Sequence, residues 1–305
     1  MAYTIMIWNT QHFDNQKGTV SDAYAEKKDF LEYYLSQKQV DIIALFETGK
    51  TGEVNEKLIN DLSANYTATS TLKQEGGKKK HTTLGSIIFI KNSIAHEFED
   101  VSDLYILSSS EQRAPLIIRH KKSAYGFAFY HSNSSYLASG NIVDTIGFIQ
   151  DNLENLTLKE LLFFGGDMNV PAQSSYEEIK GLKRLAPSDP GYTHVSITNE
   201  TLGLAAIELK SQQEFGNYVG KKPFDYLNEY KYNQGVEDCV LQETLRLLDY
   251  AYVGYANYWS ARCDGSIQKK LNNDYETTDI ARICLGKKIR SDHFPVLFTF
   301  AASFN

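Results

Sequence analysis

Polar side chains that can bind metal ions or transfer protons recur where apolar segments of this chain begin or end. The segment RSDHFPVLFTF places Asp292 and His293 directly before an apolar run, and LRLLDYAYVG carries Asp249 inside another. A carboxylate in an apolar strand needs a charged or hydrogen-bonded partner. A carboxylate that holds an imidazole also fixes its tautomer and raises its basicity. We therefore predict that Asp249 orients His293, although a turn Asp and a rim His before a core strand would give the same eleven residues.

Other apolar segments end in residues of the same kind: Asn9 after YTIMIW, Glu47 closing VDIIALFE, His131 closing YGFAFYH, and Asp167 with Asn169 after ELLFFGG. Taken singly, each has an ordinary explanation, such as a turn cap or a solvated strand end. Amide and carboxylate oxygens are hard ligands, which suit Mg²⁺ or Ca²⁺ rather than zinc. Asp167 and Asn169 are two apart, so on an extended segment their side chains would point the same way.

The segments that must position these residues are short apolar runs, typical of buried strands, separated by few helices. We expect strands at about 3–8, 40–47, 85–91, 114–120, 125–131, 160–167, 245–254 and 293–300, and helices after Ser21 and at about 142–153. This pattern predicts two packed sheets covered by helices in a single domain, residues 1–305. Residues from about 187 to 245 are expected to form loops and short elements inserted between core strands.

The charge balance limits the partners of the chain. A formal net charge of −7 and a sequence pI of about 5.6 count against a broad electrostatic footprint on nucleic acid. A local basic groove remains compatible, and the one dense basic cluster, GGKKKH at residues 76–81, is either a solvated loop or a contact to phosphates. The 3 cysteines argue against a disulfide framework.

The amino-terminal segment MAYTIMIWNTQHF has no basic region followed by a separate apolar region, so it does not resemble a signal peptide. A cytoplasmic protein and the mature form of a secreted one would both look like this. No apolar stretch approaches the roughly 20 residues of a membrane span.

The segments WNTQ, DIIALFE, YHSN, GGDMNVP, LLDYAYV and SDHFPVLF, in this order, resemble the endonuclease/exonuclease/phosphatase superfamily. The resemblance extends over residues 3–300 and implies the DNase I-like fold, a four-layer α/β sandwich of two packed, mainly antiparallel sheets flanked by helices. LLDYAYVG with SDHFPV is most similar to the branch of DNase I and the cytolethal distending toxin catalytic subunit. Inositol polyphosphate phosphatases would instead have Asp-Arg-Ile where Asp249-Tyr250-Ala251 stands.

The resemblance also implies roles for individual residues. Ligands of Mg²⁺, or of Ca²⁺ or Mn²⁺, would be Asn9, Glu47 and Asp292. Catalytic residues would be His131, Asp167, Asn169, Asp249 and His293, with His293 as the general base. Substrate phosphates would contact Arg113 and Asn133, and the alternative for Arg113 is an ordinary surface residue before a strand. One departure concerns His131, because the carboxylate that supports it in DNase I falls here near Leu84 or Gly85, neither of which can replace it.

The resemblance therefore implies a Mg²⁺-dependent phosphodiesterase, and we expect a DNA endonuclease that is monomeric alone. A phosphatase, or a phosphodiesterase acting on phosphoinositides or sphingomyelin, would use the same residues, so the motifs do not choose between them. A binding module without activity is disfavoured by the apparently complete residue set. A toxin subunit with protein partners for delivery would fit the most similar branch.

Overall fold

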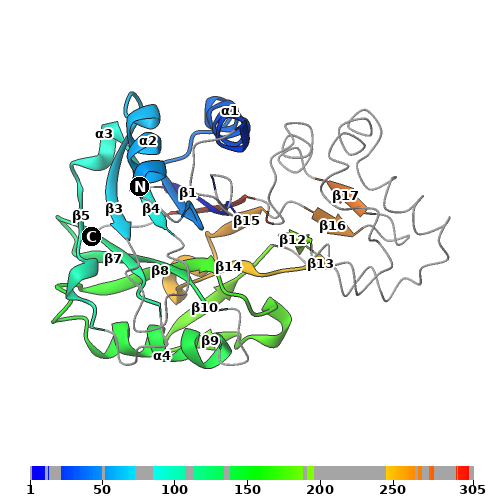
Figure 1. Ribbon diagram of the computed structural model, residues 1–305. Coiled ribbons are helices and arrows are strands. Elements are labelled where there is room, and N and C mark those ends of the chain that lie inside the picture. The colour runs from blue at the N-terminus through cyan, green and yellow to red at the C-terminus, as the bar shows by residue number, and fades with distance from the viewer. Residues whose placement is uncertain are drawn as a thin grey trace, which may run out of the picture.

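The computed structural model describes residues 2–10, 13, 22–49, 52–72, 85–106, 113–133, 138–187, 191–195, 245–264, 267–269, 275–277, 293 and 295–301. Most of the predicted insert at about 187–245, the basic cluster at residues 76–81 and Asp292 lie outside this part of the chain. The described elements stack in layers, with two sheets facing each other (Figure 1).

The first sheet has the strand order β15-β18-β1-β2-β4-β3. Its strands are β1 (Ala2–Asn9), β2 (Ile42–Phe46), β3 (Tyr66–Leu72), β4 (Ser86–Lys91), β15 (Arg262–Asp264) and β18 (Val296–Ala301). β1 and β2 are parallel, and the register places Asn9 opposite Phe46. Because of this pairing, the residues that follow the two strands emerge side by side at one edge.

The second sheet has the order β5-β6-β7-β8-β14-β10-β9. Its strands are β5 (Phe98–Asp100), β6 (Leu116–His120), β7 (Tyr125–His131), β8 (Glu160–Asp167), β9 (Glu178–Ile179), β10 (Leu182–Leu185) and β14 (Asp249–Gly254). β7 and β8 are parallel, whereas the other described neighbours in this sheet are antiparallel. Both sheets are therefore mixed, with antiparallel pairs in the majority.

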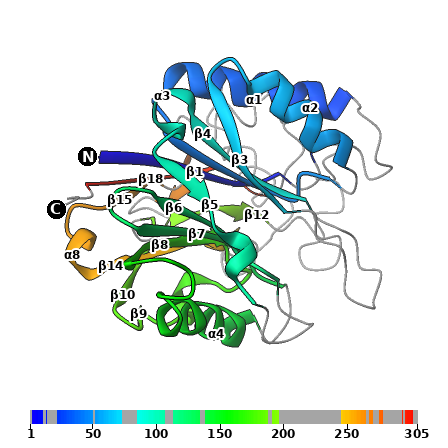
Figure 2. The same cartoon turned by 90° about the vertical axis from the view of Figure 1, so that its left-hand side faces the viewer.

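Helices cover the outer faces of the two sheets. The covering helices are α1 (Asp22–Gln37), α2 (Gly52–Leu62) and α4 (Ala138–Asp151). The shorter elements are α3 (Asn92–Ala95), α8 (Tyr255–Tyr258), which contacts strands of both sheets, and the 3-10 turns η1 (Ser102–Leu104) and η2 (Ala172–Ser174). Figure 2 shows α1 and α2 on the outside of the first sheet and α4 on the outside of the second. The predicted helices correspond to α1 and α4, whereas α2 and β3 were not predicted. Among the described helices, none is long and apolar enough to cross a membrane.

Further short strands lie beyond the two sheets. β11 (Gly191–Tyr192), β16 (Ile267–Lys269) and β17 (Tyr275–Thr277) form one small sheet, and β12 (His194–Val195) pairs with β13 (Leu245–Arg246). Strand β13 ends two residues before β14, which begins at Asp249. The β12–β13 pair therefore lies next to one of the predicted catalytic carboxylates.

The core between the sheets is rich in aromatic rings. Phe163 of β8 contacts Phe298 and Phe300 of β18 with ring centroids 5.4 and 5.9 Å apart, so the sheets interlock face to face. Gly166 permits the close approach of β7 and β8, since a Cβ built there would lie 1.7 Å from the carbonyl oxygen of Tyr130. These contacts fix the relative position of the two sheets and hence of the residues at their edges.

Candidate active site

The second sheet aligns three of the predicted residues on adjacent strands. Asp167, the last residue of β8, pairs with Asp249 at the start of β14 and with His131 at the end of β7. All three are buried. Because they share one position along the sheet, their side chains gather at a single edge of it.

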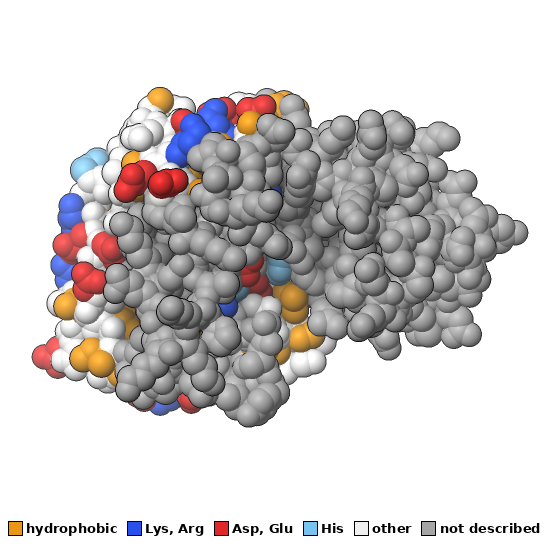
Figure 3. Space-filling view, in the orientation of Figure 1, with side chains coloured by type: hydrophobic (Ala, Val, Ile, Leu, Met, Phe, Trp, Pro, Cys, Tyr) orange, Lys and Arg blue, Asp and Glu red, His pale blue; other side chains and the backbone are white. Residues whose placement is uncertain are grey.

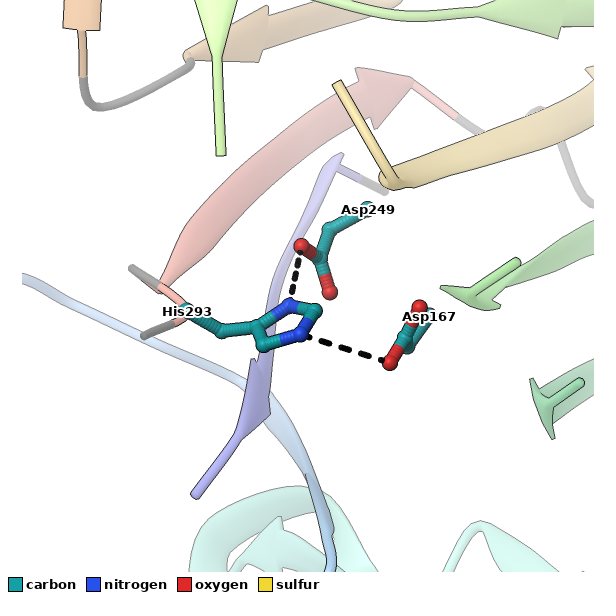
Figure 4. A group of neighbouring side chains, drawn as sticks. All are labelled: Asp167, Asp249 and His293. Carbon is teal, nitrogen blue, oxygen red and sulfur yellow. Dashed lines mark hydrogen bonds and ion pairs between the residues drawn. The ribbon is translucent and has the colours of Figure 1, made fainter. Parts of the chain in front are cut away.

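His293, from the segment preceding β18, completes this group from the first sheet. Its Nδ1 lies 2.8 Å from Asp249 Oδ2, and its Nε2 lies 3.7 Å from Asp167 Oδ2, so the ring stands between the two carboxylates (Figure 4). The indole of Trp8 donates a hydrogen bond to the His293 carbonyl at 3.1 Å. Asp249 and His293 are 0% and 4% exposed, so solvent competes little for their contact.

Asp167 is held by neighbours on both oxygens. Asn9 Nδ2 donates to its Oδ2 at 2.8 Å, and the backbone N–H of Asn169 donates to its Oδ1 at 2.9 Å. Burial raises the pKa of Asp167, and the charge of Asp249 acts in the same direction, while His293 and the two hydrogen bonds oppose the rise. This carboxylate is thus fixed in orientation within an acidic, desolvated setting.

The sequence analysis placed Asn169 on an extended segment, with its side chain parallel to that of Asp167. This prediction is wrong, because the segment is not extended at Asn169. β8 ends at Asp167, and Asn169 has a left-handed backbone with φ of 51°. Its side-chain amide donates to the Ser132 carbonyl at 2.8 Å. Asn169 therefore forms a turn in which its backbone N–H donates to the Asp167 carboxylate. Asn tolerates the left-handed backbone conformation, and the Asp side chain readily accepts a hydrogen bond from the backbone two residues on.

Glu47, which follows β2, brings the first sheet to the side chain of His131. His131 Nε2 lies 3.4 Å from Glu47 Oε1 and 3.6 Å from Asp167 Oδ2. Burial lowers the pKa of His131 well below its usual 6.5, and the positive charges of Arg113 and His293 lower it further. These effects favour the neutral form of the His131 imidazole.

Of the two positions at which the resemblance implied a carboxylate for His131, Leu84 lies outside the described residues. Gly85 precedes β4, and a Cβ built there would lie 2.6 Å from the hydroxyl of Thr48, which leaves little room for a longer side chain. The carboxylates near His131 come instead from the ends of β2 and β8.

The predicted substrate contacts lie beside this group. Arg113 donates to the Ser132 carbonyl at 3.3 Å, the same oxygen that binds Asn169. Burial lowers the pKa of Arg113, and the charges of Glu47 and Asp167 oppose that shift, which places the guanidinium within electrostatic reach of both carboxylates. Asn133 follows β7 and is half-buried. Side chains of acidic, histidine and basic type reach the surface together near the centre of the face in Figure 3.

Two sets of residues could hold a metal ion. Asn9 and Glu47, at the ends of two parallel neighbouring strands, offer hard oxygen atoms. Asp167, Asp249 and His293 offer ligand atoms within 4.8 Å of one another. Glu47, Asp167 and Asp249 bring three carboxylates into one largely buried site, and a divalent cation would relieve their repulsion. The residues present therefore fit a divalent cation.

Three buried polar residues near the site escaped the sequence analysis: Thr10, Lys27 and Thr193. Thr193 Oγ1 accepts hydrogen bonds from the backbone N–H groups of Leu248 and Asp249 at 3.1 and 3.0 Å. It thereby fixes the start of β14, where the carboxylate that contacts His293 emerges. No local pattern marks such residues, because their partners lie far away along the chain.

No protein-family model and no curated protein sequence matches this chain. Solved structures are nevertheless similar over its whole length. TDP2 from Caenorhabditis elegans is 15% identical, with 99% of this chain and 98% of that chain covered and a TM-score of 0.52. An endonuclease/exonuclease/phosphatase from Bacteroides vulgatus is 11% identical, with 99% and 100% covered and a TM-score of 0.54.

A third similar structure is D. rerio TDP2 complexed with single strand DNA product, which is 12% identical, with 99% of each chain covered and a TM-score of 0.51. These similarities, together with the two mixed sheets, establish that the chain has the same fold as these proteins, the DNase I-like α/β sandwich. The fold predicted from the resemblance is confirmed.

Proposed function

We propose that the protein is a divalent-metal-dependent phosphodiesterase and, more specifically, a Mg²⁺-dependent DNA endonuclease. The observation that supports this most is the buried His293–Asp249 contact of 2.8 Å, aimed at Asp167. An imidazole oriented by a carboxylate is the usual arrangement of a general base.

In this mechanism His293 takes a proton from water at Nε2, because its Nδ1 is engaged by Asp249. The 3.7 Å between Nε2 and Asp167 Oδ2 is too long for a direct hydrogen bond, so a water could contact both atoms. Asp167 would orient that water toward the phosphorus. Asn9 keeps the Asp167 carboxylate in place.

A cation held by Asn9 and Glu47, with Asp292 as the third predicted ligand, would neutralise charge on the phosphoryl oxygens. Neutral His131 would donate a hydrogen bond to a phosphoryl oxygen, a role that needs no positive charge. Arg113 would contact another oxygen as negative charge builds up there. Asn133 and Asn169 are proposed as further substrate contacts.

DNA is proposed as the substrate because of the fold and because D. rerio TDP2 was obtained with a single strand DNA product. The net charge of −7 implies that binding depends on few local phosphate contacts rather than on a basic surface. A phosphatase or phospholipid phosphodiesterase would share the site chemistry, so the substrate has to be determined by direct comparison.

The test compares substrates side by side in Mg²⁺: nicking of supercoiled plasmid, headgroup release from sphingomyelin and phosphoinositide vesicles, and phosphate release from a phosphomonoester. We expect nicking by the wild-type chain and its loss in His293→Ala. The exposed residue His96 provides the matched control, His96→Ala, which should nick like the wild type. Rapid headgroup or phosphate release without nicking would replace DNA by that substrate, and turnover of none of the three would contradict the proposed activity.

A further inference from the structure

Helix α1 buries a lysine among its apolar residues. Lys27 is 1% exposed and lies on the same helical stripe as Phe30, Leu31 and Tyr34, which are also buried. Its neighbour Lys28 instead pairs with Glu32 on the outside of the helix at 2.8 Å. Burial of an ammonium is unfavourable unless a strong polar partner receives it. Lys27 Nζ donates to the Thr10 carbonyl at 2.5 Å, which ties α1 to the residue that follows Asn9.

Thr10 in turn ties the end of β1 to the end of β2. Its backbone N–H donates to the Phe46 carbonyl at 2.9 Å. Its hydroxyl lies 3.0 Å from the carbonyl oxygens of both Phe46 and Glu47. Thr10 is fully buried, so water does not replace these bonds. These contacts extend the pairing of β1 and β2 by one residue, from Asn9 to Thr10 on one strand and from Phe46 to Glu47 on the other. They therefore hold the backbone at both predicted ligands, Asn9 and Glu47.

Glu47 needs such support because its backbone is in an unfavourable conformation. Its φ is 53°, in the left-handed region that residues other than Gly rarely adopt. The next residue is also held, because the Thr48 N–H donates to the Gly85 carbonyl at 2.9 Å and the Thr48 hydroxyl to Asn55 Oδ1 at 2.7 Å. Strained residues at functional sites persist when the surrounding structure holds them from several sides. Here Thr10 binds Glu47 itself, while Thr48 anchors the chain after it.

We propose that Lys27 and Thr10 are positioning residues that pre-organise Asn9 and Glu47 for a divalent cation. Lys27 fixes the Thr10 carbonyl, the Thr10 hydroxyl fixes the Glu47 carbonyl, and the Glu47 carboxylate is thereby directed toward His131 and the site. This inference rests on the proposed function for the identity of the ligand. Residues that orient ligands from outside typically change metal affinity by about 10–100-fold when removed.

The test measures binding of Mn²⁺ alone to the full chain by electron paramagnetic resonance, so that it does not depend on turnover. We expect Thr10→Val, which keeps the shape of the side chain but removes the hydroxyl, to weaken Mn²⁺ binding by about 10-fold or more. Thr10→Ser restores the hydroxyl and should bind within a few-fold of the wild type. Lys27→Met should weaken binding, whereas Lys28→Met, the adjacent control on the outside of α1, should not.

Thermal melts of the metal-free variants separate loss of folding from loss of binding. If Lys27→Met does not fold, the Thr10→Val and Thr10→Ser pair decides the question. Wild-type Mn²⁺ affinity in folded Thr10→Val would overturn the positioning role while leaving the proposed activity intact. If the wild-type chain binds no Mn²⁺ and cleaves DNA equally well in EDTA, the metal-dependent function and the positioning role fail together.

Discussion

Removal of His293 should reduce both turnover and stability. A second substitution, at Asp249, should restore part of the stability without restoring turnover. His293 Nδ1 contacts Asp249 Oδ2 at 2.8 Å, and both residues are almost fully buried. Among the described residues, Asp249 Oδ1 has no hydrogen-bond partner. His293→Ala therefore leaves a buried carboxylate without its hydrogen-bond donor, and an unpaired buried charge costs more than the about 1–3 kcal/mol of an unpaired neutral group.

Asp249→Asn in the same chain removes the stranded charge. A buried amide without a partner costs only about 1–3 kcal/mol. We therefore expect the double variant His293→Ala/Asp249→Asn to be more stable than His293→Ala alone. Turnover should behave differently. Each single variant should lose a factor of about 10² or more, the usual effect of a positioned general base, and the double variant should be little worse because the pair acts as one unit.

The stability half of this prediction is measured by urea unfolding of the wild type, both single variants and the double variant in EDTA, which excludes differences in metal binding. The activity half is measured by plasmid nicking under conditions where every variant is folded. Additive losses of turnover would show that Asp249 and His293 act independently. A double variant less stable than His293→Ala would contradict the prediction, because it would show that other groups stabilise the Asp249 charge when His293 is absent.

Other expected outcomes concern the sheet contact, the phosphate contacts and a buried tyrosine. Gly166→Ala should destabilise the fold by about 3 kcal/mol or more, because its Cβ would meet the Tyr130 carbonyl at 1.7 Å; an unchanged urea midpoint would contradict the close approach of β7 and β8. DNA affinity should fall only shallowly with salt, releasing on the order of two to four counterions, and Arg113→Ala should reduce that slope by about one; an unchanged slope would remove Arg113 from the phosphate contacts. Burial raises the pKa of Tyr66 from 10.0 to about 12, and its hydroxyl donates to the Val40 carbonyl at 2.9 Å. Between pH 10 and 12 the phenol of the unfolded chain ionises while that of the folded chain stays neutral, so the free energy of unfolding should fall by up to about 2–3 kcal/mol across that window. The stability difference between wild type and Tyr66→Phe should shrink across that window, and a constant difference would refute the assignment.

The sequence predicted the architecture well where apolar runs end in functional side chains. YGFAFYH and ELLFFGGD form the parallel neighbours β7 and β8, and their final residues, His131 and Asp167, lie opposite each other in the sheet. Such runs are informative because a fully buried strand has to be apolar along its length, so a terminal polar residue stands out. The roles assigned to these residues remain predictions.

The details that the sequence did not predict depend on backbone conformation or on distant partners. The left-handed turn at Asn169 breaks the alternation on which the extended interpretation relied. Thr10 and Lys27 have ordinary sequence neighbours, and only the folded chain brings their hydrogen bonds to Glu47 and to each other. The polar edge strand β3 carries little of the apolar signal that identified the other strands.

Metal-dependent cleavage of a phosphodiester is the central claim, and its most direct test is plasmid nicking by the wild-type chain and by Glu47→Gln, each in Mg²⁺, in EDTA, and in EDTA followed by excess Mg²⁺. Glu47→Gln keeps the length of the side chain but removes the charge of the proposed central ligand. We expect the wild type to nick DNA in Mg²⁺, to stop in EDTA and to recover when Mg²⁺ is restored. In both Mg²⁺ conditions Glu47→Gln should be slower than the wild type by at least about 10²-fold. Full nicking in EDTA, or wild-type rates from folded Glu47→Gln, would contradict the claim.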